Sequence, residues 1–557
     1  MAEKNETAVL TIRDLSEDGS GIGQVEGKTV FVKDTAVGDT ARIRILKEKK
    51  NYAFGRLEEI LTPSDFRVSP KCPVARACGG CTLQHISYSE QLRLKAKRVA
   101  DCLGRIGGIE APEKLMEPIL GMDEPFYFRN KMQFPVGLSK DGRVKIGFYA
   151  GRTHSIIDTE DCVTGHPVNR YILAAFRRWV EKEQSRTGGF VYDEKAHKGV
   201  LRHLMTRVGC FTGEVMVVPV VNGAGFARSK KEHERLAGEL VEALQGAVER
   251  YNREKGQNAD AKVVQGNVEQ YDREKGQNAD AEAEEAWTGG EKGLNTLPER
   301  NGEAFRLVSV VMNVNSERTN RILGEECVTL YGEDHISDCI GENRFLISPL
   351  SFFQVNPLQT GRLYGKALEY AGLTGKEKVW DMYCGAGTIS LSLEKAAAQV
   401  FGVEIVPQAV ENARENAKLN QRERAEFFAG KAEDVVPSLY RENPEKYRAD
   451  VVVVDPPRKG CEASLLATIL EMAPERIVYV SCDPATLARD VRILTEGGYR
   501  LKKAVPVDMF PQGMHVEVVS LLQRVSNTRE KTITLDVEME DYHRIKNGTG
   551  VTADATE

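Results

Sequence analysis

The stretch Val451-Val-Val-Val-Asp-Pro-Pro-Arg458 decides the fold, and Ile477-Val-Tyr-Val-Ser-Cys-Asp-Pro484 repeats its design further along the chain. Each stretch is a short apolar strand that ends in a turn of polar residues and proline. In an open α/β sheet, ligands bind beyond the carboxyl ends of the strands. We therefore expect Asp455 and Cys482, which occupy the two turns, to face one pocket.

Cys482 is held in its turn by the residues that follow it. Proline disfavours a helical conformation of the residue before it and fixes its own backbone angle, so Asp483-Pro484 pins the cysteine at the strand end. Two interpretations follow. The thiol is presented to a ligand, or it is a small apolar side chain packed near a strand end, the usual state of a lone cysteine.

Strands and helices alternate around these turns, from Val379 onward. Expected strands lie at 379–383, 400–404 and 425–428, and helical segments separate them. This alternation predicts an α/β domain with a doubly wound, Rossmann-like parallel sheet that carries helices on both faces.

A glycine-containing loop, Asp381-Met-Tyr-Cys-Gly-Ala-Gly-Thr388, lies between the first of these strands and its helix. Glycines there let backbone amides approach a ligand at the helix N-terminus. The next strand ends in Glu404, a carboxylate placed to accept both hydroxyls of a ribose. The loop lacks the third glycine of the dinucleotide fingerprint and any Gly-Lys-Ser/Thr sequence, which argues against NAD and ATP. We therefore expect S-adenosylmethionine as the cofactor.

Four of the 11 cysteines form a group: Cys72, Cys78, Cys81 and, far downstream, Cys162. In a large cytosolic chain, clustered cysteines bind metal or act chemically more often than they form disulfides. Four thiolates can close a tetrahedral zinc site or hold a [4Fe-4S] cluster, and the spacing does not separate the two. Either group could serve folding alone, whatever the function of the chain.

Length and charge indicate several domains in an intracellular protein. The 557 residues exceed what one core usually holds, and a polar N-terminus without an apolar run of about 20 residues predicts a cytoplasmic protein with no membrane segment. The net charge is −6, yet residues 41–56 and 91–105 are strongly basic. Such stripes attract phosphates, although a charge run is usually a solvated face.

The N-terminal third contains two further expected units. Residues 7–61 are short alternating strands separated by glycine turns, which predicts a small β-barrel. Its Gly-Xaa-Gly spacing, Val-Gly-Asp turn and basic strand resemble the TRAM domain, an OB-like RNA-binding module. Residues 86–106 are expected to form a basic helix, and residues 126–221 contain several expected strands of an α+β region.

A tandem duplication interrupts the central region. Residues 248–261 recur, with two changes, as residues 268–281. Two copies are too few for a solenoid, and the polar, charged composition of residues 246–303 cannot bury enough apolar area to offset the entropy of ordering. We expect this tract to be a disordered surface insertion, and residues 525–557 to be a C-terminal tail with a frayed end.

Methyl transfer to C5 of a pyrimidine explains why a thiol lies beside this cofactor. That carbon is a poor nucleophile until a thiolate adds to C6, which makes an enolate that attacks the methyl group. A base must then remove the C5 proton so that the thiolate can leave. Glu517, in Gly513-Met-His-Val-Glu517 at a strand end, is the candidate base; the alternative is a surface acid on an edge strand.

Together these segments resemble the RNA (uracil-5-)-methyltransferase family. The resemblance rests on the four cysteines and five further segments: Phe352–Asn356, Asp381–Gly385, Asp455–Arg458, Ser481–Pro484 and His515–Glu517. It spans residues 7–524 outside the insertion. Asp483 departs from the family pattern, in which asparagine is common at that position, and the insertion and the tail are additional.

The resemblance implies a role for each candidate residue. Cys482 would be the nucleophile and Glu517 the base. A [4Fe-4S] cluster would be held by Cys72, Cys78, Cys81 and Cys162. Cofactor contacts would come from Gln354, Tyr383, Glu404 and Asp455. The cluster is expected to be architectural, because methyl transfer to an enolate needs no electrons and cysteines fill all four iron positions.

The expected architecture has three folded parts and a tail. Residues 5–62 form the OB-like TRAM barrel, and residues 63–345 form the central α+β domain with the iron-sulfur site. Residues 346–524 form the methyltransferase domain, and residues 525–557 the tail. The turn Phe128-Arg-Asn-Lys131 is either an ordinary charged loop or a contact to the RNA or the cluster side.

The expected activity is formation of 5-methyluridine in structured RNA by a monomer. The target uridine must be splayed out of its stack to reach Cys482, while the barrel and the basic stripes hold the surrounding backbone. The barrel favours 23S rRNA over the alternative target, the T-loop of tRNA.

Two rivals belong to other classes. Asp455-Pro-Pro also resembles the Asp/Asn-Pro-Pro-Tyr turn of methyltransferases that act on exocyclic nitrogens, but Arg458 replaces the aromatic residue. A non-catalytic RNA-binding protein is the second rival, and the presence of both Cys482 and Glu517 argues against it.

Overall fold

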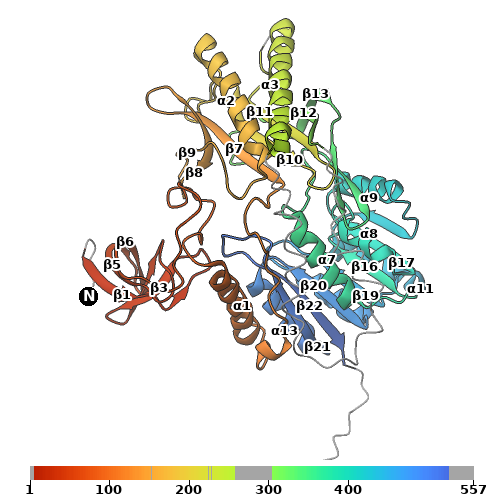
Figure 1. Cartoon of the computed structure of the whole chain (residues 1–557). Coiled ribbons are helices and arrows are strands. Elements are labelled where there is room, and N and C mark those ends of the chain that lie inside the picture. The colour runs from red at the N-terminus through yellow and green to blue at the C-terminus, as the bar shows by residue number, and fades with distance from the viewer. Residues whose placement is uncertain (1–5, 152, 224, 228, 258–303, 526–557) are drawn as a thin grey trace, which may run out of the picture.

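The computed structural model describes residues 6–151, 153–223, 225–227, 229–257 and 304–525. The chain forms a small N-terminal barrel, a central domain and a C-terminal α/β domain (Figure 1). Within the described ranges, no helix is both long enough and apolar enough to cross a membrane.

The N-terminal barrel is a sheet with the strand order β1-β5-β6-β4-β3-β2. Its strands are β1 (Thr7–Thr11), β2 (Asp14–Leu15), β3 (Gly21–Val25), β4 (Lys28–Val32), β5 (Thr40–Glu48) and β6 (Tyr52–Thr62). Because β1 runs almost directly into β2, which pairs at the other end of the order, the sheet closes on itself. Alternate side chains, such as Ile43 and Ile45, fill its interior.

The central domain is a seven-stranded sheet, in the order β13-β12-β11-β10-β7-β8-β9, that two helices cover on one face (Figure 1). Its strands are β7 (Lys131–Leu138), β8 (Val144–Tyr149), β9 (Ile156–Asp158), β10 (Leu201–Val208), β11 (Glu214–Val221), β12 (Arg306–Val314) and β13 (Glu326–Gly332). The helices are α2 (Val168–Thr187) and α3 (Lys230–Gln257). Phe176 and Trp179 of α2 lie in the core between the layers.

Helix α3 corrects the expectation that residues 246–303 are disordered. Residues 246–257 continue the helix, and Val248 and Tyr251 are only 2% and 6% exposed in the central core. The side chain of Asn252 exchanges two hydrogen bonds with the backbone of Phe305 (2.8 and 2.9 Å). The average composition of residues 246–303 does not reveal the helical end, because two apolar residues three positions apart suffice to anchor one helical face. Residues 258–303 and the tail from 526 lie outside the described residues.

The C-terminal domain has a seven-stranded sheet in the order β18-β17-β16-β19-β20-β22-β21, in which β21 and β22 are antiparallel to their neighbours. Its strands are β16 (Lys378–Met382), β17 (Gln399–Glu404), β18 (Ala425–Ala429), β19 (Val451–Val454), β20 (Arg476–Ser481), β21 (Tyr499–Val507) and β22 (Glu517–Arg524). The expected doubly wound α/β fold is thus confirmed for β16 to β20, and β22 inserts between β20 and β21.

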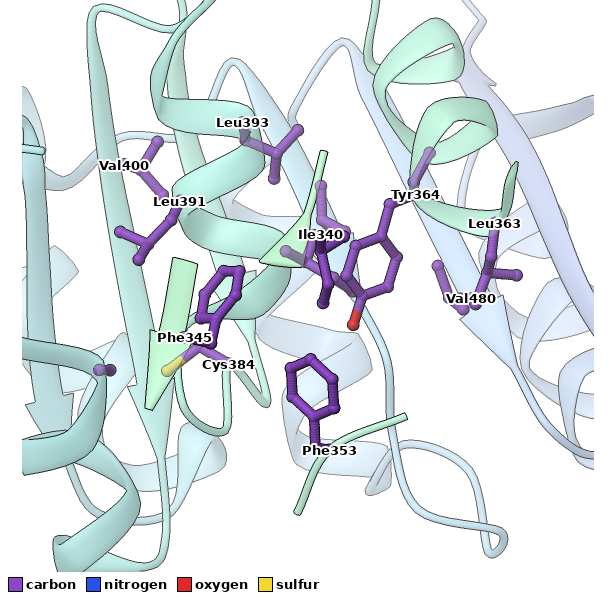
Figure 2. Close-up of a cluster of buried hydrophobic side chains, with 14 of the residues drawn as sticks. Ile340, Phe345, Phe353, Leu363, Tyr364, Cys384, Leu391, Leu393, Val400 and Val480 are labelled. Atoms are coloured by element: carbon purple, nitrogen blue, oxygen red, sulfur yellow. The ribbon is translucent and has the colours of Figure 1, made fainter. Parts of the chain in front are cut away.

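Helices cover both faces of this sheet. They are α7 (Pro357–Ala371), α8 (Thr388–Glu394), α9 (Pro407–Leu419), α10 (Ala432–Glu442), α11 (Pro444–Tyr447), α12 (Ala463–Met472) and α13 (Pro484–Glu496). The hairpin β14 (Ile336–Ile340) and β15 (Asn343–Ile347) belongs to the same core, since Ile340 and Phe345 lie beside Leu391 of α8 and Tyr364 of α7 (Figure 2).

Helix α1 (Tyr88–Arg105) joins the N-terminal part of the chain to the C-terminal domain. It lies beside α13, and Val99 and Leu103 enter the core of that domain (Figure 1). Lys95 forms a fully buried ion pair with Asp508 (2.5 Å). The short 3-10 helix η1 (Pro112–Leu115) follows α1. The segment before Glu517 is therefore fixed by a helix more than 400 residues away in sequence.

Candidate active site

Three strand ends bring Asp455, Cys482 and Glu517 together. Asp455 and Cys482 directly follow the neighbouring parallel strands β19 and β20, and Glu517 opens β22 on the other side of β20. Ser481 pairs with Val518, so Cys482 and Glu517 occupy the same end of adjacent strands. The charges of Asp455 and Glu517 both act on the Cys482 thiol, which shows that the three side chains share one local field.

Glu517 is a buried acid, which excludes the interpretation as a surface residue of an edge strand. It is only 4% exposed, and its strand has a partner on each side. Burial raises the pKa of Glu517 to about 8, and the charge of Asp455 adds to the increase, while Arg458 opposes it. A carboxylate whose pKa lies near neutral pH suits a general base.

The Cys482 thiol is half-buried at the end of β20. Burial raises the pKa of Cys482 to about 11, and the charges of Glu517 and Asp455 add to this, while Arg458 lowers it. In the free protein the sulfur is therefore protonated. A positive charge, or protonation of a neighbouring carboxylate, favours the thiolate, which is the nucleophilic form.

Asp483, the departure from the family pattern, acts as the N-cap of α13. Its Oδ1 accepts hydrogen bonds from the amides of Ala485 (2.9 Å) and Thr486 (3.1 Å). An aspartate caps a helix as well as asparagine does, and its negative charge is favourable at a helix N-terminus. The substitution therefore keeps the helix start, and with it the place of Cys482.

The glycine-containing loop, residues 381–388, bends sharply between β16 and α8. Tyr383 has a positive φ of 96°, and its amide and that of Cys384 donate to Val403 O (both 3.0 Å). The amide of Gly385 donates to Glu404 Oε2 (3.2 Å), and the amide of Val406 donates to Oε1 (2.9 Å). Glu404 is thus held at the end of β17, facing the glycine loop, as a ribose-binding acid requires.

Asp381 is a site residue to which the sequence pattern assigned no role. It is fully buried at the end of β16, and Ser390 Oγ donates to its Oδ2 (2.5 Å), while Oδ1 has no partner among the described residues. Burial raises the pKa of Asp381 to about 7, with Glu404 adding, and that of Asp455 also to about 7, with Asp381 adding. The sequence signal that could have identified Asp381 is the presence of an acid within an otherwise apolar strand.

The carboxylates Asp381, Glu404 and Asp455 give this end of the sheet a negative character. Each carboxylate that remains ionised without a cationic partner costs folding free energy. S-adenosylmethionine carries a sulfonium and an ammonium group, so its positive charges match the acids, and the unpartnered Asp381 oxygen offers an acceptor. The residues present therefore fit the expected cofactor.

Gln354 lies in the loop before α7, and its side chain is almost buried. The backbone oxygen of Gln354 accepts a hydrogen bond from Asn130 Nδ2 (2.9 Å), and the backbone oxygen of Val355 accepts one from the backbone N–H of Asn130 (2.9 Å). This loop is therefore tied to the start of β7. Within the described chain, no hydrogen bond joins the Gln354 side chain to Tyr383, Glu404 or Asp455.

The four candidate ligand cysteines lie near one another as free, partly buried thiols. Burial raises the pKa of Cys72, Cys78 and Cys81, the last to about 12, and the charge of Cys162 adds to the shift of each. In the part of the chain that is described, however, no three His, Cys, Asp or Glu side chains are close enough to hold a single metal ion.

Hydrogen bonds connect this cysteine segment to the site. The amides of Thr82 and Leu83, which follow Cys81, both donate to Gln512 O (2.9 and 3.0 Å). Gln91 of α1 bonds the same residue, since its Oε1 accepts from the Gln512 amide (3.1 Å). Gln512 belongs to the loop that leads into Glu517, so the cysteines and the candidate base are held by one connected segment.

Comparison with known proteins gives the family. The tRNA (Uracil-5-)-methyltransferase model matches residues 343–525, and the TRAM domain model matches residues 2–57. An RNA methyltransferase of Clostridium tetani is 42% identical over 520 residues, which cover 93% of this chain and 97% of the relative. One of Bacillus cereus is 42% identical over 523 residues, covering 94% and 98%.

A solved structure agrees with this assignment. The crystal structure of Pyrococcus abyssi tRNA (uracil-54, C5)-methyltransferase, in complex with S-adenosyl-L-homocysteine, is 26% identical, with a TM-score of 0.64. The match covers 92% of this chain and 100% of that chain. The chain therefore belongs to the tRNA (uracil-5-)-methyltransferase family: it is an S-adenosylmethionine-dependent RNA methyltransferase with an N-terminal TRAM domain.

Proposed function

We propose that this enzyme methylates C5 of one uridine in 23S rRNA through a covalent bond between Cys482 and the base. The observation that carries the covalent mechanism is the meeting of a half-buried thiol and a buried carboxylate, Cys482 and Glu517, at the strand ends next to the glycine-containing loop.

The residues divide the chemistry between them. Cys482 adds as a thiolate to C6 of the uracil, which makes C5 an enolate carbon. Bound S-adenosylmethionine supplies the methyl group. Glu517 takes the C5 proton, the C5–C6 double bond reforms and the Cys482 sulfur leaves as a thiolate. The charge of Arg458 lowers the pKa of both Cys482 and Glu517, so it favours the reactive form of each.

The barrel supplies an outer face that suits RNA. Phe31, Tyr52 and Phe54 form a cluster on β4 and β6, with ring centroids 5.5 to 5.8 Å apart, and Tyr52 is exposed. Of the basic residues at 41–56, Arg42 and Arg44 pair with glutamates of the barrel, whereas Lys47 and Arg56 pair with no acid in the described chain. Aromatic rings and unpaired cations together bind bases and phosphates.

The second basic stripe, residues 91–105, attracts phosphates less than its charge suggests. Helix α1 carries it, and its cations are neutralised within the protein. Arg93 pairs with Glu90, Lys95 with Asp508, Lys97 with Asp14 and Asp101, Arg98 with Glu17, and Arg105 with Asp101. This stripe therefore joins the domains, and its value for attracting phosphates is small.

The choice of RNA can be tested directly. We expect the purified enzyme to transfer labelled methyl groups to a 23S rRNA transcript at least about 10-fold faster, in kcat/KM, than to tRNA transcripts, which corresponds to about 1.4 kcal/mol of transition-state stabilisation. The alternative target is the T-loop uridine of tRNA, which the similarity to the Pyrococcus abyssi tRNA (uracil-54, C5)-methyltransferase supports. Equal or faster transfer to tRNA would decide for that alternative.

We further propose that Cys72, Cys78, Cys81 and Cys162 hold a [4Fe-4S] cluster. In such a cluster each thiolate binds a different iron, so the sulfurs stand further apart than around one zinc ion. The charge of Cys162 acts on the thiols of Cys72, Cys78 and Cys81, and this proximity of four thiols supports the proposal.

Metal analysis tests this assignment. Protein purified without oxygen is expected to contain about four iron and four acid-labile sulfide per chain. Replacing Cys81 with serine should lower both contents and the melting temperature, whereas Cys327→Ser, on the exposed strand β13, should change neither. One zinc per chain, with no sulfide, would contradict the cluster.

A further inference from the structure

The turn Phe128–Lys131 sends its two cations in different directions. The guanidinium of Arg129 lies 5.7 Å from the centre of the Phe510 ring, and the charges of Cys81 and Cys162 act on it. Arg129 is therefore a residue of the cysteine side. Lys131 opens β7 and lies on the opposite strand position to Arg207 of β10. The charges of the cysteines thus give Arg129 a partner, but they do not act on Lys131.

Arg207 is a buried cation and Lys131 a partly buried one, and neither pairs with an acid among the described residues. Arg207 is only 3% exposed; its guanidinium donates to the backbone oxygens of Pro349 and Ser351, and its Nε has no partner. Lys131 is partly buried and makes no side-chain hydrogen bond or ion pair with any described residue. No carboxylate of the described chain acts on either cation: burial lowers the pKa of both, and Arg207 lowers that of Lys131 further, to about 8.

This arrangement is unusual within the same molecule. Lys95, a fully buried lysine, forms an ion pair with Asp508 and donates to Phe510 O (3.0 Å). Buried charges are normally paired, because an unpaired one loses its hydration without compensation. Two adjacent cations with no acid among the described residues are therefore suited to binding an anion.

The pair lies at the start of β7, beside the loop that leads into α7. Side chains that alternate with the core residues of β7 point away from α2 and α3, and Gln133 on this face contacts Met205 of β10. Arg207 holds the loop before α7 through Pro349 and Ser351, and the same loop carries Gln354. Phe352, which lies between Ser351 and Gln354 in this loop, is 74% exposed. The two cations therefore lie beside the loop that carries Gln354, a predicted cofactor contact.

We propose that Lys131 and Arg207 form a binding site for a phosphate of the RNA backbone beside the target uridine. This inference rests on the proposed function, since it assumes that RNA enters the site. A phosphate would supply the missing counter-charge and fix the backbone while the base is splayed towards Cys482. The carboxylate of S-adenosylmethionine is the other anion that could reach this place, and the test separates the two.

The test compares Lys131→Met with Lys140→Met, which removes the same charge from the exposed β7–β8 turn. Binding of a labelled 23S rRNA fragment is measured as a function of salt concentration. We expect Lys131→Met to weaken the affinity about 10-fold and to reduce the slope of log K against log[salt] by about 1, whereas Lys140→Met leaves the slope unchanged. The melting temperature of the free Lys131→Met protein should not fall, because an unpaired buried charge is removed.

Two further measurements complete the test. The KM for RNA of Lys131→Met should rise about 10-fold while kcat and the affinity for S-adenosylmethionine stay within about twofold of wild type. Affinity and salt slope equal to those of Lys140→Met would overturn the proposal, as would a loss of cofactor affinity with unchanged RNA binding. If the wild-type protein itself bound the fragment but did not methylate it, the proposed function would fail while the phosphate site could still be judged from the slopes.

Discussion

Replacing Cys482 with alanine is expected to abolish methylation, with a fall in kcat of at least about 10⁴-fold, because it removes the half-buried thiol, whereas Cys384 and Cys461 are buried. The half-buried side chain is small and caps no helix, so affinity for RNA and for S-adenosylmethionine should remain within about threefold of wild type. Transfer of labelled methyl groups to RNA, together with binding titrations of both ligands, measures this separation of chemistry from binding.

The matched control is Cys327→Ala, which removes an exposed thiol on β13 far from the sheet ends of the C-terminal domain. It should leave turnover unchanged. Methylation by Cys482→Ala at a rate near that of wild type would exclude covalent addition and revive direct transfer to an exocyclic nitrogen, the chemistry of enzymes with a related Asp-Pro-Pro turn.

Replacing Glu517 with glutamine is expected to trap the enzyme on its RNA. The amide has the same shape but does not accept the C5 proton, so the bond between Cys482 and C6 forms and does not break. Loss of the Glu517 charge also removes one cause of the raised Cys482 pKa, which favours the thiolate. A methylated adduct of protein and RNA should therefore accumulate, visible as a slow band on a denaturing gel.

Glu496→Gln, an exposed change at the C-terminal end of α13, is the control and should turn over normally without an adduct. The pKa of Glu517, about 8, adds a pH dependence: the base accepts a proton only when ionised, so release of methylated RNA by the wild type should accelerate as the pH rises through 8. Normal turnover by Glu517→Gln with no adduct would remove Glu517 from this role.

The sequence pattern predicted the parallel part of the C-terminal sheet because each strand there is a local signal. Val451–Val454 is a continuous apolar run closed by Asp455-Pro-Pro, and all four of its valines are buried. The place of Glu517 could not be read in this way. Its strand pairs with β20 and β21, and its burial results from contacts that no local pattern encodes.

Long-range contacts also explain what the charge pattern missed. Residues 91–105 read as a basic stripe, but acids from the barrel, from Asp508 and from the helix itself neutralise it. Conversely, the sequence shows Lys131 as one cation of a charged turn, and only the fold places it beside Arg207 with no acid from the described chain acting on it. Composition likewise misjudged residues 246–257, whose Val248 and Tyr251 are core residues of α3.

Mapping of 5-methyluridine in cellular RNA tests the central claim most directly. In a strain that lacks this gene, one 5-methyluridine of 23S rRNA should be absent, and the wild-type gene should restore it whereas the Cys482→Ala gene should not. Persistence of every 5-methyluridine in the deletion strain, or restoration by the Cys482→Ala gene, would contradict the account.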